Sequence, residues 1–119
     1  MFYRMAILAS LLAVIASPTL ADGFMRVSDR ENFMSLVQDR QLKRFGIKLQ
    51  VSDQGQISGR AFGQKVTGDW NWNNGYFCRD LFVGGDELGA NCQLVEVKGR
   101  TLRFTSDQGE GIYADLRLE

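Results

Sequence analysis

The sequence predicts a small, mainly β domain of the α+β class, and three observations support that prediction. The tryptophan-rich stretch 68–92 holds an Asn74-Gly75 turn signal between two strand-like runs. Short runs of alternating apolar and polar residues recur between glycine-containing turns, and one helical pattern precedes them. Sequential antiparallel strands tend to curl and close, which removes exposed edges. We therefore expect a small antiparallel up-and-down β-barrel or curved sheet of about seven strands, with one N-terminal helix and one disulfide.

Residues 1–21 have the three-part pattern of a secretory signal peptide. One positive charge precedes an apolar run, and Pro18 and a small-residue exit follow it. The apolar run is shorter than the roughly 20 residues that a bilayer-spanning helix needs. We therefore expect cleavage after Ala21, a single domain over residues 22–119, no membrane span after cleavage, and a periplasmic or secreted protein.

The chain has two cysteines, Cys78 and Cys92, and no histidine. In an exported protein two cysteines are expected to form a disulfide. They enclose about 15 residues, for which the loss of chain entropy on cross-linking corresponds to about 3 kcal/mol of stability. Two cysteines without histidine make a poor zinc site. We therefore expect a structural disulfide, no metal and no cofactor.

Residues 28–40 predict the helix. Ser28 and Glu31 have the spacing of a capping box, in which each side chain bonds the backbone amide of the other residue. An apolar stripe follows at helical spacing and comprises Phe33, Leu36 and Val37. We expect this stripe to pack on the sheet.

After the helix the apolar pattern changes to the period of a strand. Strands are predicted over 41–44, 47–51, 56–62, 93–97 and 112–118, in both arms of the Asn74-Gly75 hairpin, into which residues 65–68 lead, and after the turn at Gly99-Arg100. Gly59 in the third of these indicates a bulge or a close approach of two backbones. In the last strand the side chains expected to point inward are Ile112, Ala114, Leu116 and Leu118. Placing the turn at Gly99-Arg100 keeps the apolar residues of two strands on one face, with Val97 opposite Leu102.

The Asn74-Gly75 turn predicts a hairpin that pairs Trp72 with Phe77 and Trp70 with Arg79. Because side chains alternate across a strand, one face carries those four residues and the other carries Asn71, Asn73, Tyr76 and Cys78. The interpretation we favour places the aromatic residues of the first face in the core. The alternative is an aromatic and arginine surface that binds a partner, with a cation–π pair between Trp70 and Arg79.

The stretch 80–91 is expected to be a glycine-rich loop that the disulfide tethers. It begins with Leu81, Phe82 and Val83, which cannot all face the core of a two-sided strand. They either close one end of the barrel or present a recognition surface on a rigid scaffold. The candidate binding surface therefore comprises Trp70, Trp72, Tyr76, Arg79, Leu81, Phe82 and Val83.

The sequence identifies no catalytic residue. It lacks a Gly-x-Ser-x-Gly elbow, a phosphate loop and a Gly-x-Gly-x-x-Gly fingerprint, and the absence of histidine removes the commonest general base. Without Arg4 the chain has 13 Lys and Arg against 14 Asp and Glu, and its densest basic run is Lys43-Arg44. Nucleic-acid binding requires a clustered basic face, so we expect no nucleic-acid partner.

Several short motifs resemble those of a group of small uncharacterised exported β-domain proteins of Gram-negative bacteria. They are Gly68-x-Trp70, Tyr76-Phe77-Cys78-Arg79, Cys92 and the segment 102–107. The resemblance covers most of the chain after residue 21 and implies no catalytic residue. Some of these proteins carry the label dihydrodipicolinate reductase. That family has a Rossmann domain and a His-His motif, whereas this sequence has neither a glycine fingerprint nor histidine, so the label is not supported.

A second likeness is to lipocalin-type and bacterial protease-inhibitor barrels. The motif Gly68-Asp69-Trp70 is similar to theirs. In lipocalins this motif opens the first strand, whereas here it lies in the middle of the chain.

The function that the sequence favours is a non-enzymatic binding module, a monomer that acts on an unknown protein or envelope component. The alternatives are a carrier of a small apolar ligand in a barrel cavity and an inhibitor of an extracellular hydrolase. Enzymatic activity is the third hypothesis, after a binding module and a carrier. The volume of the barrel interior distinguishes a carrier from a surface binder, because a core filled by Trp70, Trp72, Phe62 and Phe104 leaves no room for a ligand.

Overall fold

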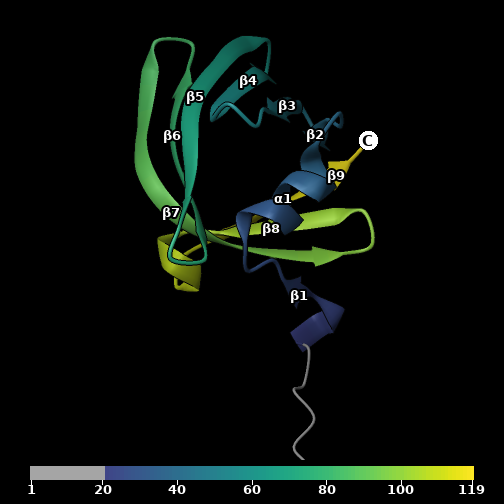
Figure 1. The fold of residues 1–119 in the computed structure, drawn as a ribbon. Helices are drawn as coiled ribbons and strands as arrows, with labels where there is room; N and C mark the ends of the chain where they lie inside the picture. The colour runs from purple at the N-terminus through teal and green to yellow at the C-terminus, as the bar shows by residue number, and fades with distance from the viewer. Residues whose placement is uncertain (1–20) are drawn as a thin grey trace, which may run out of the picture.

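The computed structural model describes residues 21–119, which form a closed antiparallel β-barrel (Figure 1). The predicted signal peptide lies outside the described residues, apart from Ala21. The barrel strands are β2 (Leu42–Arg44), β3 (Ile47–Val51), β4 (Gln56–Ala61), β5 (Gln64–Asn73), β6 (Tyr76–Val83), β7 (Asp86–Lys98), β8 (Thr101–Thr105) and β9 (Tyr113–Leu118). Each strand pairs with the next, and β9 pairs with β2 to close the barrel. The predicted up-and-down barrel is confirmed.

The helix α1 (Arg30–Val37) is shorter than the sequence indicates. Its N-cap is Asp29, whose Oδ1 accepts a hydrogen bond from the Asn32 amide at 2.8 Å. The predicted capping box of Ser28 and Glu31 is therefore wrong by one residue. Asp29 directly follows Ser28, and an aspartate is as good an N-cap residue as a serine. The helix ends before residue 40 because the backbone at Gln38 is already extended.

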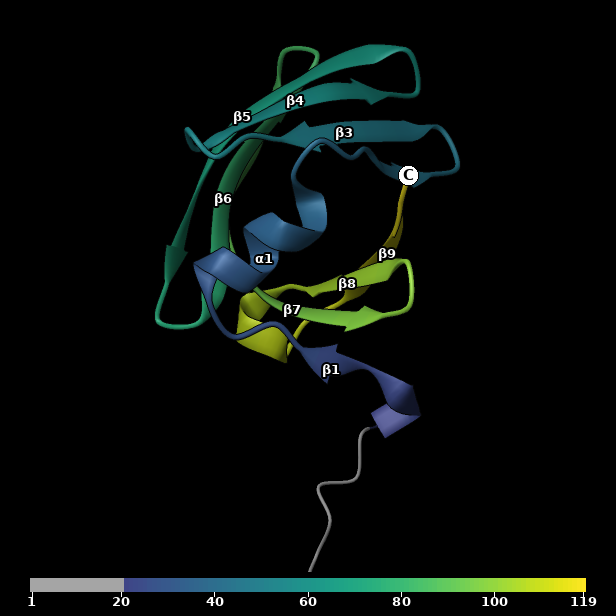
Figure 2. The same ribbon diagram turned by 45° about the vertical axis from the view of Figure 1, so that its right-hand side comes forward.

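The helix lies at one end of the barrel, and the strands form a ring around it in Figure 2. Phe33 is fully buried and its ring centroid lies 5.0–6.4 Å from those of Trp70, Trp72, Phe77 and Phe104. Arg30 Nη2 donates to the carbonyl of Asp53 in the β3–β4 turn at 2.5 Å. Trp72 Nε1 donates to the carbonyl of Ser28 just before the helix at 3.2 Å. The predicted packing of the helix stripe is confirmed, and we call this end of the barrel the helix end.

The tryptophan hairpin has the predicted register, with Trp72 opposite Phe77 and Trp70 opposite Arg79. Asn74 and Gly75 have φ of 52° and 85°, as the two-residue turn requires. Trp70 is 5% exposed and Trp72 packs against the core, so the core interpretation of both tryptophans is confirmed. The cation–π pair considered between Trp70 and Arg79 is not formed: the guanidinium over the Trp70 ring, at 5.0 Å, is that of Arg30.

The stretch 80–91 is a hairpin and not the predicted loop. The strands β6 and β7 continue through it and meet at a two-residue Gly84-Gly85 turn. Leu88 is an extra residue in β7, where the register shifts, and this bulge hides the alternation in the sequence. Cys78 and Cys92 lie directly opposite one another on these strands and form the predicted disulfide. A disulfide indicates an oxidising, non-cytoplasmic compartment.

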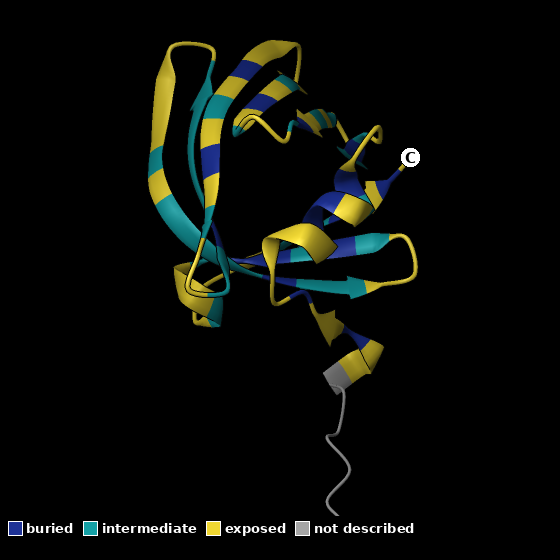
Figure 3. Ribbon diagram, in the orientation of Figure 1, coloured by how far each residue is buried: buried dark blue, intermediate teal, exposed yellow. Residues whose placement is uncertain are grey.

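Buried and exposed positions alternate along β4 and β5, as Figure 3 shows. Gly59 confirms the predicted close approach, because a Cβ there would overlap the Lys48 carbonyl oxygen and lie 2.9 Å from Leu49 Cα. Ile112, predicted to point inward, is 84% exposed, because β9 begins one residue later, after the 3₁₀ turn η2 (Asp107–Gly109). Phe62, expected in the core, is 70% exposed in the β4–β5 turn.

The N-terminal segment is fastened to the outside of the barrel. A two-residue strand, β1 (Met25–Arg26), pairs with β7 and is too short for a sequence pattern to indicate. Next to it, the Arg103 guanidinium lies 4.1 Å from the ring centroid of Phe24 and 4.0 Å from that of Tyr113. Arg103 also donates two hydrogen bonds to Asp115, at 2.8 and 3.0 Å. These bonds hold the pKa of Asp115 below its ordinary value.

We expect Asp115→Asn to lower stability at neutral pH and to have little effect in acid. The folded state holds the Asp115 pKa below its unfolded value of about 3.9. The stability that the ion pair contributes is therefore present above that unfolded pKa and is lost as pH falls through the lower folded pKa. Urea unfolding of the wild-type and Asp115→Asn proteins at pH 7 and pH 3 measures this contribution. Asp86→Asn, at a turn carboxylate that makes no ion pair within residues 21–119, is the control. A difference between wild type and Asp115→Asn that is as large at pH 3 as at pH 7 would contradict the assignment.

Candidate functional site: the barrel cavity

A cavity of about 210 Å³ lies inside the barrel, below the aromatic cluster that α1 covers. Phe77 and Phe104 separate it from Phe33, and no residue of α1 lines it. Every barrel strand except β5 contributes to its walls. The apolar lining residues are Leu42, Ile47, Leu49, Val51, Ile57, Phe77, Leu81, Phe104, Ala114 and Leu116, and the polar ones are Arg44, Arg79 and Gln93. The cavity is therefore an apolar chamber with few polar groups.

Glycines stand at three inward positions of the barrel wall. Gly68 of β5 and Gly89 of β7 lie on either side of Leu81, and Gly59 of β4 lies opposite Leu49. Inward positions of an eight-stranded barrel normally carry the side chains that fill it, unless the barrel holds a small ligand. A Cβ at Gly59 or Gly68 would overlap the backbone of the neighbouring strand, so these two glycines allow a close approach of strands. At Gly89, beside Leu81, no atom lies within 4 Å of the place of a Cβ.

The cavity reaches toward the end of the barrel opposite α1, which we call the open end. Arg44 and Ile47, on either side of the β2–β3 turn, line it there. Backbone hydrogen bonds from Phe62 to Gly46, at 2.7 Å, and from Gly84 to Lys65, at 2.8 Å, bring three hairpin turns together. Four exposed apolar residues project from this end and form what we call the apolar rim: Phe45, Phe62, Leu88 and Ile112.

Arg79 places a half-buried cation in the wall of the cavity. Its Nη1 donates to the carbonyl of Gly89 at 2.7 Å. Burial lowers the pKa of Arg79, and the charge of neighbouring Asp80 partly opposes that shift. Among residues 21–119 no carboxylate lies within ion-pair distance of its guanidinium. A guanidinium has five N–H donors, so most of them are free to bind a ligand group.

The structure divides the seven residues of the predicted binding surface between two faces of the β5–β6 sheet. Trp70 and Trp72 belong to the aromatic cluster, and Arg79 and Leu81 line the cavity. Val83 follows them at an inward, half-buried position. Tyr76 and Phe82 lie on the outer face. The seven residues do not form one continuous surface, because β6 continues through the stretch that was expected to be a loop.

Sequence reasoning missed two polar residues of the cavity, Arg44 and Gln93. Arg44 is the last residue of β2, and Gln93 lies in the middle of β7, which the sequence pattern predicts only from residue 93 onward. For Arg79 and Leu81 a signal was present, because they continue the period-two pattern that starts at the buried Phe77.

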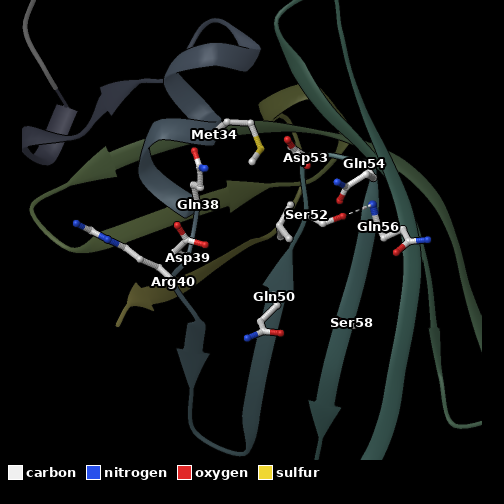
Figure 4. A pocket seen from close by; sticks show the side chains of 11 residues that line it. Met34, Gln38, Asp39, Arg40, Gln50, Ser52, Asp53, Gln54, Gln56 and Ser58 are labelled. Atoms are coloured by element: carbon white, nitrogen blue, oxygen red, sulfur yellow. Dashed lines mark hydrogen bonds between the residues drawn. The ribbon is translucent and has the colours of Figure 1, made fainter.

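A larger depression, of about 540 Å³, lies on the surface between the end of α1 and the β3–β4 hairpin. Figure 4 shows Gln38 and Asp39 on one side of it and Ser52, Gln54 and Gln56 on the other, while Arg40 points away. Its lining is mostly polar and solvated, and the one hydrogen bond drawn joins the Gln56 amide to Ser52 Oγ at 3.2 Å. We therefore take the apolar interior cavity as the candidate site.

No protein-family model, curated protein or solved structure matches this chain. The resemblances drawn from the sequence therefore stay predictions. In the described part of the chain, no three His, Cys, Asp or Glu side chains are grouped so that they could hold a metal ion. None of the helices between residues 21 and 119 has the length and hydropathy of a bilayer-spanning segment.

Proposed function

We propose that this protein binds a small amphipathic ligand in its barrel cavity, in the periplasm or outside the cell. The observation that supports the proposal is the apolar cavity of about 210 Å³ at the centre of the barrel. A surface binder has no use for such a space, and a filled core would be more stable. Of the four residues expected to fill the core, Phe62 lies outside it on the apolar rim.

The volume of the cavity limits the ligand. An apolar cavity of about 150 Å³ holds a benzene molecule, so the present one suits a ligand of roughly eight to ten non-hydrogen atoms. Transfer of about six methylene groups from water, at about 0.8 kcal/mol each, contributes about 5 kcal/mol. That free energy corresponds to a Kd of about 0.1 to 1 mM before any polar contact is added.

Arg79 selects the polar end of the ligand. A half-buried cation without a carboxylate partner is costly, and an anionic group bound beside Arg79 offsets that cost. A carboxylate can accept two parallel hydrogen bonds from a guanidinium. The ligand is therefore a short-chain carboxylate or a molecule of the same chemistry, with its apolar part between Leu49 and Leu81.

The test is calorimetric titration with hexanoate and with hexanol. Wild-type protein should bind both, and hexanoate more tightly. Arg79→Gln should bind the two equally, because it removes the charge and keeps a hydrogen-bonding side chain. Ala114→Leu, which fills part of the cavity, should weaken both ligands at least tenfold. Ala90→Leu adds the same atoms at an exposed position, where they should have no effect. Absence of binding, or binding that Ala114→Leu leaves unchanged, would contradict the proposal.

A further inference from the structure

A row of basic side chains crosses the outer surface of the barrel. The strand register places Arg117 opposite Lys43, Lys43 opposite Lys48, Lys48 opposite Arg60, and Arg60 opposite Lys65. We call these five residues the basic row. They come from β9, β2, β3, β4 and β5, which are consecutive neighbours in the closed sheet. Their chain neighbours Leu42, Leu49, Ala61, Val66 and Leu116 are inward-facing, so the basic side chains point outward.

The charges of the basic row are evenly spaced and mostly unpaired. Neighbouring strands lie about 4.8 Å apart, so the row presents one positive charge about every 5 Å along roughly 20 Å. Like charges directly opposite one another destabilise a sheet. Lys43 pairs with Glu119 at 3.1 Å, whereas the other four have no carboxylate partner within the range that the structure describes. The arrangement therefore lowers stability unless an external anion neutralises it.

The surface beside the basic row carries few carboxylates. Glu119 is bound by Lys43 and Asp115 by Arg103. The next outward residues on β3, β4 and β5 are Gln50, Ser58 and Thr67, which face one another in register. The single carboxylate on these three strands is Asp69, farther along β5. Basic side chains therefore outnumber carboxylates on this face, which favours an anionic partner.

An aromatic ring adjoins one end of the basic row. Phe82 lies on the outer face of β6 opposite Thr67. With Lys65, Ser58, Thr67 and Asp69 it lines an open depression of about 430 Å³. A sugar ring packs its C–H face on the negative face of an aromatic ring, and the neighbouring hydroxyl groups can bind sugar hydroxyls. The depression thus combines an apolar ring, hydroxyl groups, one cation and one carboxylate.

We propose that the basic row, together with Phe82, binds a linear anionic polysaccharide. The spacing of one charge per strand suits a polymer that carries one carboxylate on each sugar. The row winds around five of the eight barrel strands, so a flexible chain can follow it, whereas a flat membrane reaches only part of it. The disulfide indicates a non-cytoplasmic compartment, which favours a polysaccharide over a nucleic acid. The site faces outward and is independent of the cavity.

The first experiment measures binding of polygalacturonate oligomers between 20 and 200 mM salt. The logarithm of the association constant should fall linearly with the logarithm of the salt concentration, with a slope of about 0.7 for each cation engaged, as for flexible single strands. Fully methyl-esterified oligomers of the same length keep the backbone and lose the charge, and they should not bind. Absence of binding to the charged oligomer at 20 mM salt would overturn the proposal.

Two double variants of equal charge locate the site. Lys48→Gln/Arg60→Gln removes the centre of the basic row and should weaken binding about tenfold, reduce the salt slope by about 1.4 and raise Tm, because repulsion between opposite residues is relieved. Arg26→Gln/Arg40→Gln removes two exposed charges elsewhere and should change affinity less than about twofold. Phe82→Ala should weaken binding and keep the salt slope.

The remaining outcomes decide against the proposal. Equal loss of affinity in the two double variants would show attraction to net charge rather than a site. Tighter binding of single-stranded DNA with the same number of charges, or of vesicles rich in anionic lipid, would replace the polysaccharide by another class of polyanion. An effect of Lys48→Gln/Arg60→Gln on hexanoate binding would contradict the independence of the two sites.

Discussion

Replacing Phe33 by alanine should lower the free energy of unfolding by about 3–5 kcal/mol. The Phe33 ring is fully buried and is in contact range of four other aromatic rings, from three different strands. The eight-residue helix that carries it is too short to be stable alone, so its position depends on this packing. We therefore expect a fall in Tm of at least about 12 °C, at about 4 °C or more for each kcal/mol in a domain of this size.

Urea unfolding followed by tryptophan fluorescence measures this effect, because Trp70 and Trp72 both contact the Phe33 ring. Leu36→Ala, on the same helix but half-buried, is the matched control. It should lower the free energy of unfolding clearly less than Phe33→Ala does. The emission of the folded Phe33→Ala protein should shift to longer wavelength as water reaches the indoles. A loss below about 1.5 kcal/mol would mean that the helix is held by other contacts.

Local turn chemistry explains why much of the fold could be predicted. The Asn74-Gly75 turn fixes the register of β5 and β6, because a two-residue hairpin leaves one pairing that matches the side-chain pattern. The apolar pairs around Gly99-Arg100 fix that of β7 and β8 in the same way. In both hairpins the partners are close in the chain, so no knowledge of the rest of the fold was needed.

The stretch 80–91 could not be predicted because its local signals conflict. Four small residues and three acidic ones indicate a loop. In the barrel, however, Gly84-Gly85 is only a two-residue turn, and Gly89 pairs with Leu81 inside a strand. The bulge at Leu88 then breaks the alternation on which strand prediction depends. Pairing with β5 keeps the backbone of β6 extended, although the composition of this stretch indicates a loop.

The cavity and the basic row depend on contacts between distant parts of the chain. The cavity exists only because β9 closes on β2, and no short-range pattern predicts which strands meet at a barrel seam. The basic row takes one residue from each of five strands, so each lysine or arginine is isolated in the sequence. The expectation that the protein has no clustered basic face, made from the Lys43-Arg44 run, is therefore wrong. The absence of a nucleic-acid partner stays a prediction.

Removing the disulfide should lower the free energy of unfolding by about 3 kcal/mol, the chain-entropy value for a loop of about 15 residues. Cys78 and Cys92 face each other on β6 and β7, on the side away from the cavity. The Cys78→Ala/Cys92→Ala variant removes both sulfurs and leaves no free thiol. Its barrel should stay folded at 25 °C, with Tm about 12–24 °C below that of the oxidised wild-type protein.

Thermal unfolding with and without reductant measures this effect. Reduced wild-type protein should match the double variant, and reductant should leave the Tm of the variant unchanged. The disulfide closes the β6–β7 hairpin below its glycine turn, so backbone amides of residues 82–90 should lose hydrogen-exchange protection first when it is absent. Hexanoate binding uses Arg79, which lies between the two cysteines in the chain, so it should weaken when the disulfide is removed. Equal Tm values for oxidised and reduced wild-type protein would mean that strand pairing alone holds this hairpin.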